Sequence, residues 1–313
     1  MILNAVALMP GAAQVPMVRE RLRRRDLGTG GSNSPRYCYS VWLRHLTMAA
    51  GAGLNTHPRS IAELGPGDSI GTGLCGLLCG AERYSALDVV EHANPVSNVM
   101  IFDALVEILR ARADIPGREF PDVGPRLDDY RFPAHILTEE RMALALHPKR
   151  VARLRDAVLG DDPDGRILYR VPWLEASVIE PASQDMVFSQ AVLEHVDALP
   201  EAYRAMRAWL KPGGYVSHQI DFKCHDLADT WDGHWRYGEL RWKLLRGPSV
   251  WFINRQPYSE HLRLLREAGF RVLAEQPVTR QPSFERRSLA RPFRAMAEAD
   301  RSTSGAYVLA QPA

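Results

Sequence analysis

The chain has few cysteines for its length. Four occur among 313 residues, at widely spaced positions: Cys38, Cys75, Cys79 and Cys224. This set is too sparse for a disulfide framework, so we expect reduced thiols and a cytoplasmic protein. Cys75 and Cys79 lie four positions apart in a predicted helix, so they share one face. They form either a metal-binding or redox pair or part of the packed core, and packing is the favoured interpretation.

Long apolar runs and an excess of one charge are also missing. No stretch of about 18 apolar residues occurs, which excludes a membrane-spanning helix. The segment 1–16 has no basic start and is broken by Pro10, Gly11 and Pro16, so we expect no signal peptide. Lys and Arg number 39 against 37 Asp and Glu, too even a balance for a protein that relies on phosphate attraction to bind nucleic acid.

What the sequence does contain is an alternation of short apolar runs with helical patterns. This alternation is typical of an open, mostly parallel α/β sheet. We expect strands at 60–64, 84–90, 166–171, 185–190, 215–222, 271–275 and 306–310. We expect helices at 69–80, from 94 to about 109, near 138–158, at 199–210 and at 259–269.

Three segments fall outside that alternation. We predict a helical N-terminal extension over 1–58 and one α/β domain over 59–313, with insertions at 113–164 and 223–258. The second insertion is aromatic and contains Trp231, Trp235, Tyr237, Trp242, Trp251, Phe252 and Tyr258. It is either a lid over a site or a satellite core that packs against 113–164, since long insertions usually serve as lids or binding loops.

A glycine-rich turn follows the first predicted strand. It reads Glu63-Leu-Gly65-Pro-Gly67, and its glycines would let the chain turn tightly and a ligand approach the backbone. In the nicotinamide fingerprint a third glycine would stand at Ile70, but here it comes one residue later, at Gly71. The acid before the turn suits a cationic ligand better than a pyrophosphate. A plain strand–helix turn is the alternative.

Two later segments complete a pattern. Gln184 to Val196 contains Val-Leu-Glu-His-Val, and Trp209 to Gly214 reads Trp-Leu-Lys-Pro-Gly-Gly before a strand. With the glycine turn and Asp88 at the end of the second predicted strand, the order of motifs resembles the class I S-adenosylmethionine-dependent methyltransferases over roughly 59–222.

The resemblance implies a fold, a cofactor and a set of binding residues. The fold is a Rossmann-like seven-stranded, mostly parallel sheet of order 3-2-1-4-5-7-6 with an antiparallel last strand. The cofactor is S-adenosylmethionine, cradled by the turn, with Asp88 on its ribose. The full set of expected cofactor-binding residues is Glu63, Gly65, Gly67, Asp88, Val89, Pro172, Trp173 and Ser189. Trp173 stands where the family often has an acid, so stacking on adenine and filling the core are equally open roles.

Catalytic candidates lie at the ends of the fourth and fifth predicted strands, where the site of an open α/β sheet lies. His195 is the first choice as base or substrate contact, followed by Asp221 and His225. His218 should face away from Asp221 by strand alternation. We predict no metal, although His218, Asp221 and His225 as ligands are the less favoured alternative.

The predicted function is methyl transfer to an oxygen atom of a small-molecule, sugar or natural-product acceptor. Ser189-Gln-Ala-Val replaces the Asn/Asp-Pro-Pro-Tyr/Phe motif of enzymes that methylate nucleobase amines. The segments Ser217–His225 and Trp231–Trp235 resemble a subgroup found in bacterial glycan and natural-product biosynthesis. A nicotinamide-dependent oxidoreductase and a non-catalytic cofactor-binding protein are the alternatives. Neither a nucleic-acid nor a membrane partner is expected, and nothing in the sequence indicates an oligomeric state.

Overall fold

A single sheet forms the centre of the computed structural model, which describes residues 31–173, 175–225, 227–246 and 253–313. Its seven strands lie in the order β3-β2-β1-β4-β5-β7-β6. The strands are β1 Ser60–Leu64, β2 Arg83–Leu87, β3 Ile167–Arg170, β4 Gln184–Gln190, β5 Leu210–Asp221, β6 Phe270–Thr279 and β7 Thr303–Pro312. The predicted strand order is confirmed.

Pairing within the sheet also matches the prediction. Strands β1 to β5 pair in parallel, whereas β7 runs antiparallel to both β5 and β6. The carboxyl ends of β1, β2, β4 and β5 therefore meet at one edge. In a sheet of this kind that edge is where ligands bind.

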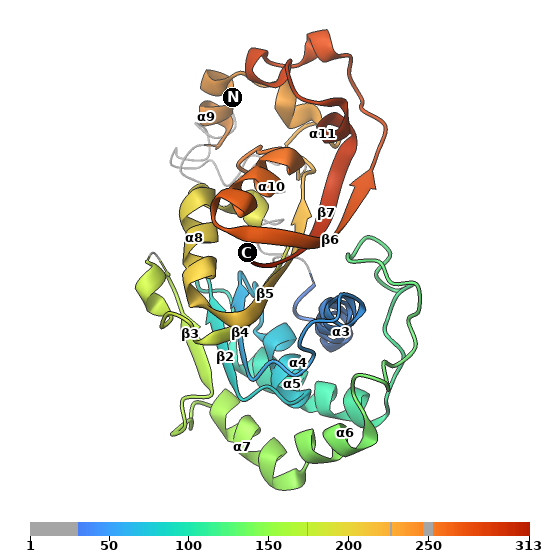
Figure 1. The fold of residues 1–313 in the computed structure, drawn as a ribbon, viewed down its shortest axis with the longest axis vertical. Coiled ribbons are helices and arrows are strands. Elements are labelled where there is room, and N and C mark those ends of the chain that lie inside the picture. Colours follow the sequence, from blue (N-terminus) through green and yellow to red (C-terminus); the bar gives the residue numbers. More distant parts are fainter. Residues whose placement is uncertain (1–30, 174, 226, 247–252) are drawn as a thin grey trace, which may run out of the picture.

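Helices cover both faces of the sheet (Figure 1). They are α3 Pro35–Gly51, α4 Gly71–Leu78, α5 Pro95–Arg110, α8 Leu199–Trp209 and α10 Tyr258–Glu267. Apolar residues of α3, α4 and α5 form one core with the sheet, and those of α8 and α10 form a second core on the opposite face. Helix α8 buries the stripe predicted for it, from Leu199 to Trp209.

The predicted helix near 138–158 is two helices. These are α6 Glu139–Ala145 and α7 Pro148–Val158. Pro148 has no N–H to continue α6, and it takes the first turn of α7, where that donor is not needed. The side chain of His147 accepts a hydrogen bond from Lys149 N at 3.3 Å and caps the second helix.

The described part of the N-terminal segment packs into the main core. Arg44 of α3 is almost fully buried, and its guanidinium donates to the carbonyl oxygens of Pro116 and Phe120 at 3.3 Å and of Pro125 at 3.0 Å. This contact ties the helix to the insertion 113–164. Residues 1–30 of the predicted extension lie outside the described residues.

The aromatic insertion has its own small apolar clusters. It contains η4 Gly233–Arg236 and α9 Glu239–Arg246, and η6 Arg291–Phe293 and α11 Glu298–Ser302 follow later in the chain. Trp235 packs with Leu289 and Met296, and Trp242 packs with Ile253. Among the described residues neither cluster includes a residue of 113–164, so these clusters do not support packing against that insertion, one of the two open interpretations. Trp251 and Phe252 lie outside the described residues.

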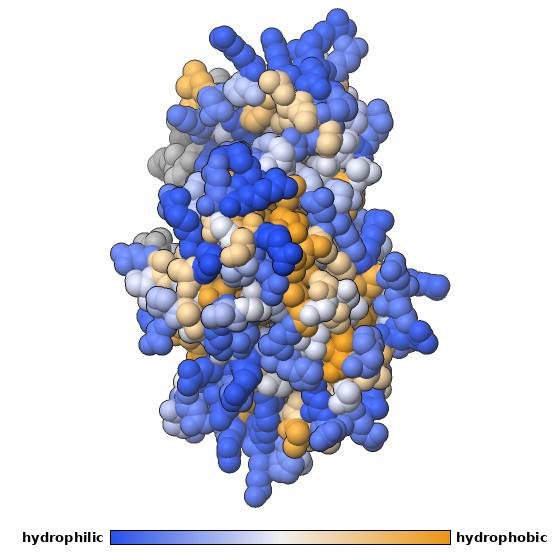
Figure 2. All heavy atoms as spheres, in the orientation of Figure 1, coloured by the Kyte–Doolittle hydropathy of each residue, from blue (hydrophilic) through white to orange (hydrophobic). Residues whose placement is uncertain are grey.

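The surface is mostly polar. Hydrophilic side chains dominate the face shown in Figure 2, with hydrophobic ones gathered near its middle. Within the described ranges, no helix combines the length and the apolar character needed to cross a bilayer. The four cysteines are buried, and none of them forms a disulfide within the described residues.

Candidate functional site

The glycine-rich turn leaves β1 with a backbone that only glycine adopts easily. Gly65 has φ +61° and Gly67 has φ +74°, both in the left-handed region. Gly65 N donates to Leu87 O at 2.8 Å, which ties the turn to the end of β2. A Cβ atom at Gly65 would come within 2.5 Å of Val192 Cγ2, so the turn lies directly against the segment that follows β4.

Glu63 is buried at the end of β1, beneath this turn. The hydroxyl of Tyr84 donates to its carboxyl group. Burial raises the pKa of Glu63 from 4.5 to about 8, against the opposing effect of the Tyr84 hydrogen bond. The carboxyl is therefore mostly protonated at neutral pH, and a positive charge nearby would ionise it.

Asp88 joins β2 to the same turn. Its carboxylate accepts hydrogen bonds from Val89 N at 2.7 Å and Gly67 N at 3.3 Å. Burial raises its pKa, while these backbone donors act in the opposite direction. Val89 beside it is 49% exposed, an unusual exposure for an aliphatic side chain next to a buried carboxylate.

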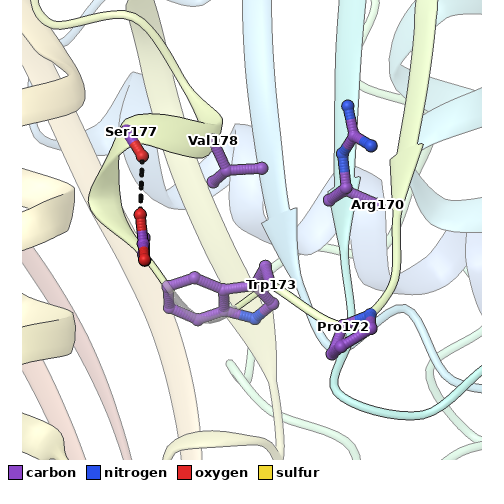
Figure 3. A pocket seen from close by; sticks show the side chains of 6 residues that line it. Arg170, Pro172, Trp173, Ser177 and Val178 are labelled. Atoms are coloured by element: carbon purple, nitrogen blue, oxygen red, sulfur yellow. Dashed lines mark hydrogen bonds between the residues drawn. The ribbon is translucent and has the colours of Figure 1, made fainter.

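A pocket of about 350 Å³ opens beyond Asp88 (Figure 3). Its lining residues are Arg170, Pro172, Trp173, Glu175, Ser177 and Val178. Trp173 N donates to Asp88 O at 3.0 Å, which fixes the pocket next to the turn. The Trp173 ring also meets the Trp209 ring edge-on at 5.6 Å, so one side chain both lines the pocket and packs on the core. We call Glu63–Gly67, Asp88, Val89, Pro172 and Trp173 the glycine-turn side.

Ser189 does not join the glycine-turn side. It is fully buried, and its hydroxyl shares a 2.8 Å hydrogen bond with Nδ1 of His218. Burial lowers the pKa of His218 to about 3, so that this imidazole is neutral. The hydroxyl is thus engaged inside the sheet, and a contact between Ser189 and the cofactor stays a prediction.

Three of the predicted residues come together at the ends of β4 and β5. The rings of His195, at the end of η3 Leu193–His195, and His225 meet edge-on at 5.1 Å. His225 Nε2 lies 3.4 Å from Asp221 Oδ2, and Lys223 Nζ lies 3.1 Å from the same oxygen. His225 has φ +48°, a left-handed conformation that costs energy in a residue with a Cβ atom.

The Asp221 carboxylate is held in its charged form. Burial alone would raise its pKa, but the hydrogen bond from His225 and the charge of Lys223 outweigh burial and lower it. These three residues line a pocket of about 290 Å³ that reaches toward Trp231. The site therefore combines a carboxylate, two imidazoles and an adjacent space.

Glu194 belongs to the same cluster and was not among the predicted site residues. Its side chain is buried, and neither carboxyl oxygen has a well-aligned hydrogen bond among the described residues. Burial, reinforced by the nearby Asp221, raises its pKa well above the usual range. We call Glu194, His195, Asp221 and His225 the histidine side. Glu194 stands within the Leu-Glu-His motif, which is the signal that could have identified it.

Asn254 positions the turn that carries Glu194 and His195. Its side-chain Nδ2 donates to Leu193 O and Val196 O, both at 2.8 Å, and its backbone N donates to Glu194 O at 2.6 Å. Asn254 lies far along the chain from η3, inside the aromatic insertion. No pattern in the sequence pointed to this contact.

Tyr37 stands near the start of α3. Burial raises the pKa of its hydroxyl, and the carboxyl groups of Glu63 and Glu194 both act in the same direction. The hydroxyl is therefore influenced by one carboxyl group from each side of the site. The Tyr37 ring is itself held edge-on against Phe120 at 5.5 Å.

The structure separates the metal ligands considered from sequence. His218 lies in the sheet interior, away from Asp221 and His225. Instead, Glu194, His195 and His225 each offer one ligating atom, and these atoms lie within 4.8 Å of one another.

Comparison with known proteins points to one family. The model of a family described as a methyltransferase domain matches residues 86–275. No curated protein matches the sequence significantly.

Several solved structures are similar. An S-adenosylmethionine-dependent methyltransferase from Mesorhizobium loti is 16% identical over 85% of this chain and 97% of its own, with a TM-score of 0.42. A putative S-adenosylmethionine-dependent methyltransferase from Listeria monocytogenes is 13% identical, covering 90% and 100%, with a TM-score of 0.43. A putative sarcosine dimethylglycine methyltransferase from Galdieria sulphuraria is 12% identical, covering 97% and 91%, with a TM-score of 0.45.

Proposed function

This chain belongs to the methyltransferase domain family, and on that basis we propose that it methylates a hydroxyl oxygen of a small acceptor molecule, with S-adenosylmethionine as methyl donor. The observation that carries the choice of acceptor atom is the pair of imidazoles, His195 and His225, with Asp221. They stand at the carboxyl ends of β4 and β5, beside the glycine turn. A hydroxyl group must lose its proton to become a methyl acceptor, and a positioned imidazole is suited to take it.

The glycine-turn side fits the methyl donor. S-adenosylmethionine supplies a methyl group on a positively charged sulfur. The buried carboxyl of Glu63 can ionise next to this positive charge, because its raised pKa leaves it with a proton that it can release. Asp88 is placed to accept hydrogen bonds from two ribose hydroxyls, and Gly65 and Gly67 leave the backbone open to a ligand.

The adenine would lie against Val89, Pro172 and Trp173. The exposed Val89 side chain, with Pro172 and Trp173 from the lining of the pocket of about 350 Å³, offers apolar contacts next to Asp88. The edge-on contact with Trp209 keeps the Trp173 ring in place, so packing and adenine contact are compatible roles for it.

On the histidine side we assign the base to His195. In its neutral form, the imidazole can accept the acceptor's hydroxyl proton at pH 7. Asp221, charged at that pH, holds His225 through its Nε2 atom, and the His225 ring packs edge-on against His195. His225 and Asp221 thus orient the base and stabilise the positive charge that it gains.

We further propose that a cover formed by α3 and the insertion 223–258 encloses the acceptor. The Tyr37 hydroxyl of α3 is influenced by the carboxyl groups of Glu63 and Glu194, and Asn254 from the insertion donates to the two carbonyl groups that flank Glu194 and His195. Such a cover excludes water and suits a small molecule better than a polymer. In this proposal, the segment 1–58 and the insertions 113–164 and 223–258 are additions that help the α/β domain 59–313 to form its site.

The test uses S-adenosylmethionine labelled with ¹³C in its methyl group. The enzyme is incubated with a panel of small phenols, sugars and amines, and the products are examined by carbon NMR. We expect a methoxy carbon, and a rate that rises with pH through the imidazole range near ~6.5. A product with only N-methyl or C-methyl carbons would contradict oxygen as the acceptor atom while leaving the methyl donor unaffected.

A further inference from the structure

We propose that Glu194, His195 and His225 form a binding site for a divalent transition-metal ion, with Zn²⁺ as the representative ion. One ligating atom from each side chain lies within 4.8 Å of the other two. The three residues come from two turns, η3 after β4 and the turn after β5, so the fold itself brings them together. Ion binding here is a property beyond methyl transfer and can be measured without any acceptor.

The buried Glu194 carboxyl is an independent observation in favour of a ligand. It is 2% exposed, and neither oxygen has a side-chain partner or a well-aligned hydrogen bond among the described residues; the backbone N–H groups of Glu194 and Asp221 oppose the effect of burial only in part. A buried polar group without a partner is costly, and a buried charge without one costs more. A cation bound by this carboxyl, and shared with the two imidazoles, would remove that cost.

The kind of ligand selects the kind of ion. Two imidazoles and one carboxylate suit Zn²⁺ and neighbouring first-row transition ions, whereas Mg²⁺ and Ca²⁺ prefer sites made of oxygen atoms alone. Three protein ligands also leave a coordination position open, as catalytic zinc sites do. A pocket of about 290 Å³ that His225 lines lies next to the three ligands and would be the source of water or an acceptor hydroxyl for that position.

The surrounding charges partly favour and partly oppose the ion. Asp221 Oδ2, at 3.4 Å from His225 Nε2, can hold the ring in one tautomer and make its other nitrogen a better ligand. Lys223 already places a positive charge next to Asp221, with 3.1 Å between Nζ and Oδ2. Its side chain is 35% exposed on a flexible stem, so it can turn to solvent when an ion binds.

An ion at this position would also change how the acceptor hydroxyl loses its proton. In the ion-free protein the imidazole of His195 takes that proton. With an ion bound, His195 is occupied as a ligand, and the ion lowers the pKa of a hydroxyl at its open position. This consequence rests on the proposed function, but the binding of the ion does not.

The experiment measures ion binding by the chelator-treated, dialysed full-length protein. Zn²⁺ is titrated by calorimetry, and Co²⁺ is followed by its visible absorption, which reports the geometry of the ion and the atoms that bind it. We expect one equivalent of each ion and a cobalt spectrum of four or five nitrogen and oxygen ligands. The proposal would be overturned if the protein bound neither Zn²⁺ nor Co²⁺. A thiolate-to-cobalt absorption band would also overturn it, because it would place the ion on a cysteine.

Variants distinguish this site from chance binding by surface histidines. Glu194→Gln and His225→Ala should each weaken Zn²⁺ binding by at least about 100-fold, and Asp221→Asn by about 10–100-fold, the usual range for a residue that holds a ligand. His135→Ala removes an exposed histidine of the insertion 113–164 and should leave affinity unchanged. His225 is exposed, so its variant should fold even if Glu194→Gln does not. Equal Zn²⁺ affinity in the wild type and His225→Ala would refute the site. Affinity for S-adenosylhomocysteine, measured on the same variants, reports separately on the glycine-turn side.

Discussion

The two sides of the site differ in how they treat buried carboxyl groups. On the glycine-turn side, Asp88 accepts hydrogen bonds from the backbone of Gly67 and Val89, and Glu63 accepts one from Tyr84. On the histidine side, the buried Glu194 carboxyl has no well-aligned hydrogen bond among the described residues, and only the backbone N–H groups of Glu194 and Asp221 act on it. The carboxyl groups of the first side therefore already have donors within the chain. In our proposal, a cation from outside the chain completes the second side.

The largest expected effect is a loss of S-adenosylmethionine affinity when Asp88 of the glycine-turn side is replaced. Asp88→Ala removes two charge-assisted hydrogen bonds to the ribose, each worth roughly 1.5–3 kcal/mol, so affinity for S-adenosylmethionine should fall about 10²–10⁴-fold. Calorimetry measures the loss directly. Asp88→Asn, which keeps one acceptor oxygen, should lose less, and a wild-type affinity in Asp88→Ala would place the ribose elsewhere.

Glu63 should couple cofactor binding to a proton. With a pKa of about 8 the carboxyl is mostly protonated at pH 7, and the positive charge of the bound donor should ionise it. Calorimetric titrations in buffers of different ionisation enthalpy should show the release of close to one proton. Glu63→Gln should abolish the buffer dependence, and a buffer-independent wild type would contradict the assignment.

The same raised pKa makes a prediction for stability. A carboxyl whose pKa is 4.5 when unfolded and about 8 when folded stabilises the fold below pH 4.5, and that contribution is lost as the pH rises through about 8. Glu63→Gln should therefore flatten the pH dependence of the free energy of unfolding over this window. Denaturant titrations at intervals between pH 5 and pH 8 compare the two proteins.

The Asn254→Ala variant tests whether the histidine side depends on the hydrogen bonds from Asn254 to Leu193 and Val196. Asn254→Ala leaves two carbonyl groups without their donor, which should cost about 1–3 kcal/mol of stability and lower turnover by up to about 100-fold as η3 moves. Affinity for S-adenosylhomocysteine should stay at the wild-type value. Gln256→Ala, at an exposed amide two residues away, is the matched control and should change neither quantity.

The smallest effect is expected far from both sides. Arg155 of α7 and Asp103 of α5 form an ion pair at 2.9 Å, with side chains 42% and 49% exposed. Exposed pairs of this kind contribute about 0.2–1 kcal/mol. Arg155→Ala should lower the melting temperature only slightly and leave binding and turnover unchanged, whereas a loss of activity would mean that the two sides are not as self-contained as described.

The glycine-turn side was largely predictable because its residues are close in sequence to the strands that present them. Strand periodicity and the motif order gave β1, β2, β4 and β5, and the family resemblance gave the order of the sheet. Strand ends were less accurate: β6 runs to Thr279 and β7 starts at Thr303, because pairing between two antiparallel strands extends them beyond their apolar centres.

The histidine side was only partly predictable because its contacts join distant parts of the chain. His195, Asp221 and His225 follow strands, so their meeting could be expected. Asn254 and Tyr37 reach the site from an insertion and from the N-terminal helix, where no local pattern marks them. The hydrogen bond between Ser189 and His218 could not be predicted for the same reason, since the two residues stand on neighbouring strands.

The central claim is that one side binds the donor and the other activates the acceptor, and His195→Ala tests it most directly. Affinity for S-adenosylhomocysteine and single-turnover methyl transfer are measured on the same protein samples, with His135→Ala as control. We predict an affinity within about two-fold of wild type and a turnover lower by roughly 10²–10⁴-fold. Turnover that stays near the wild-type rate, or a loss of affinity that accounts for the loss of turnover, would contradict the division between the two sides.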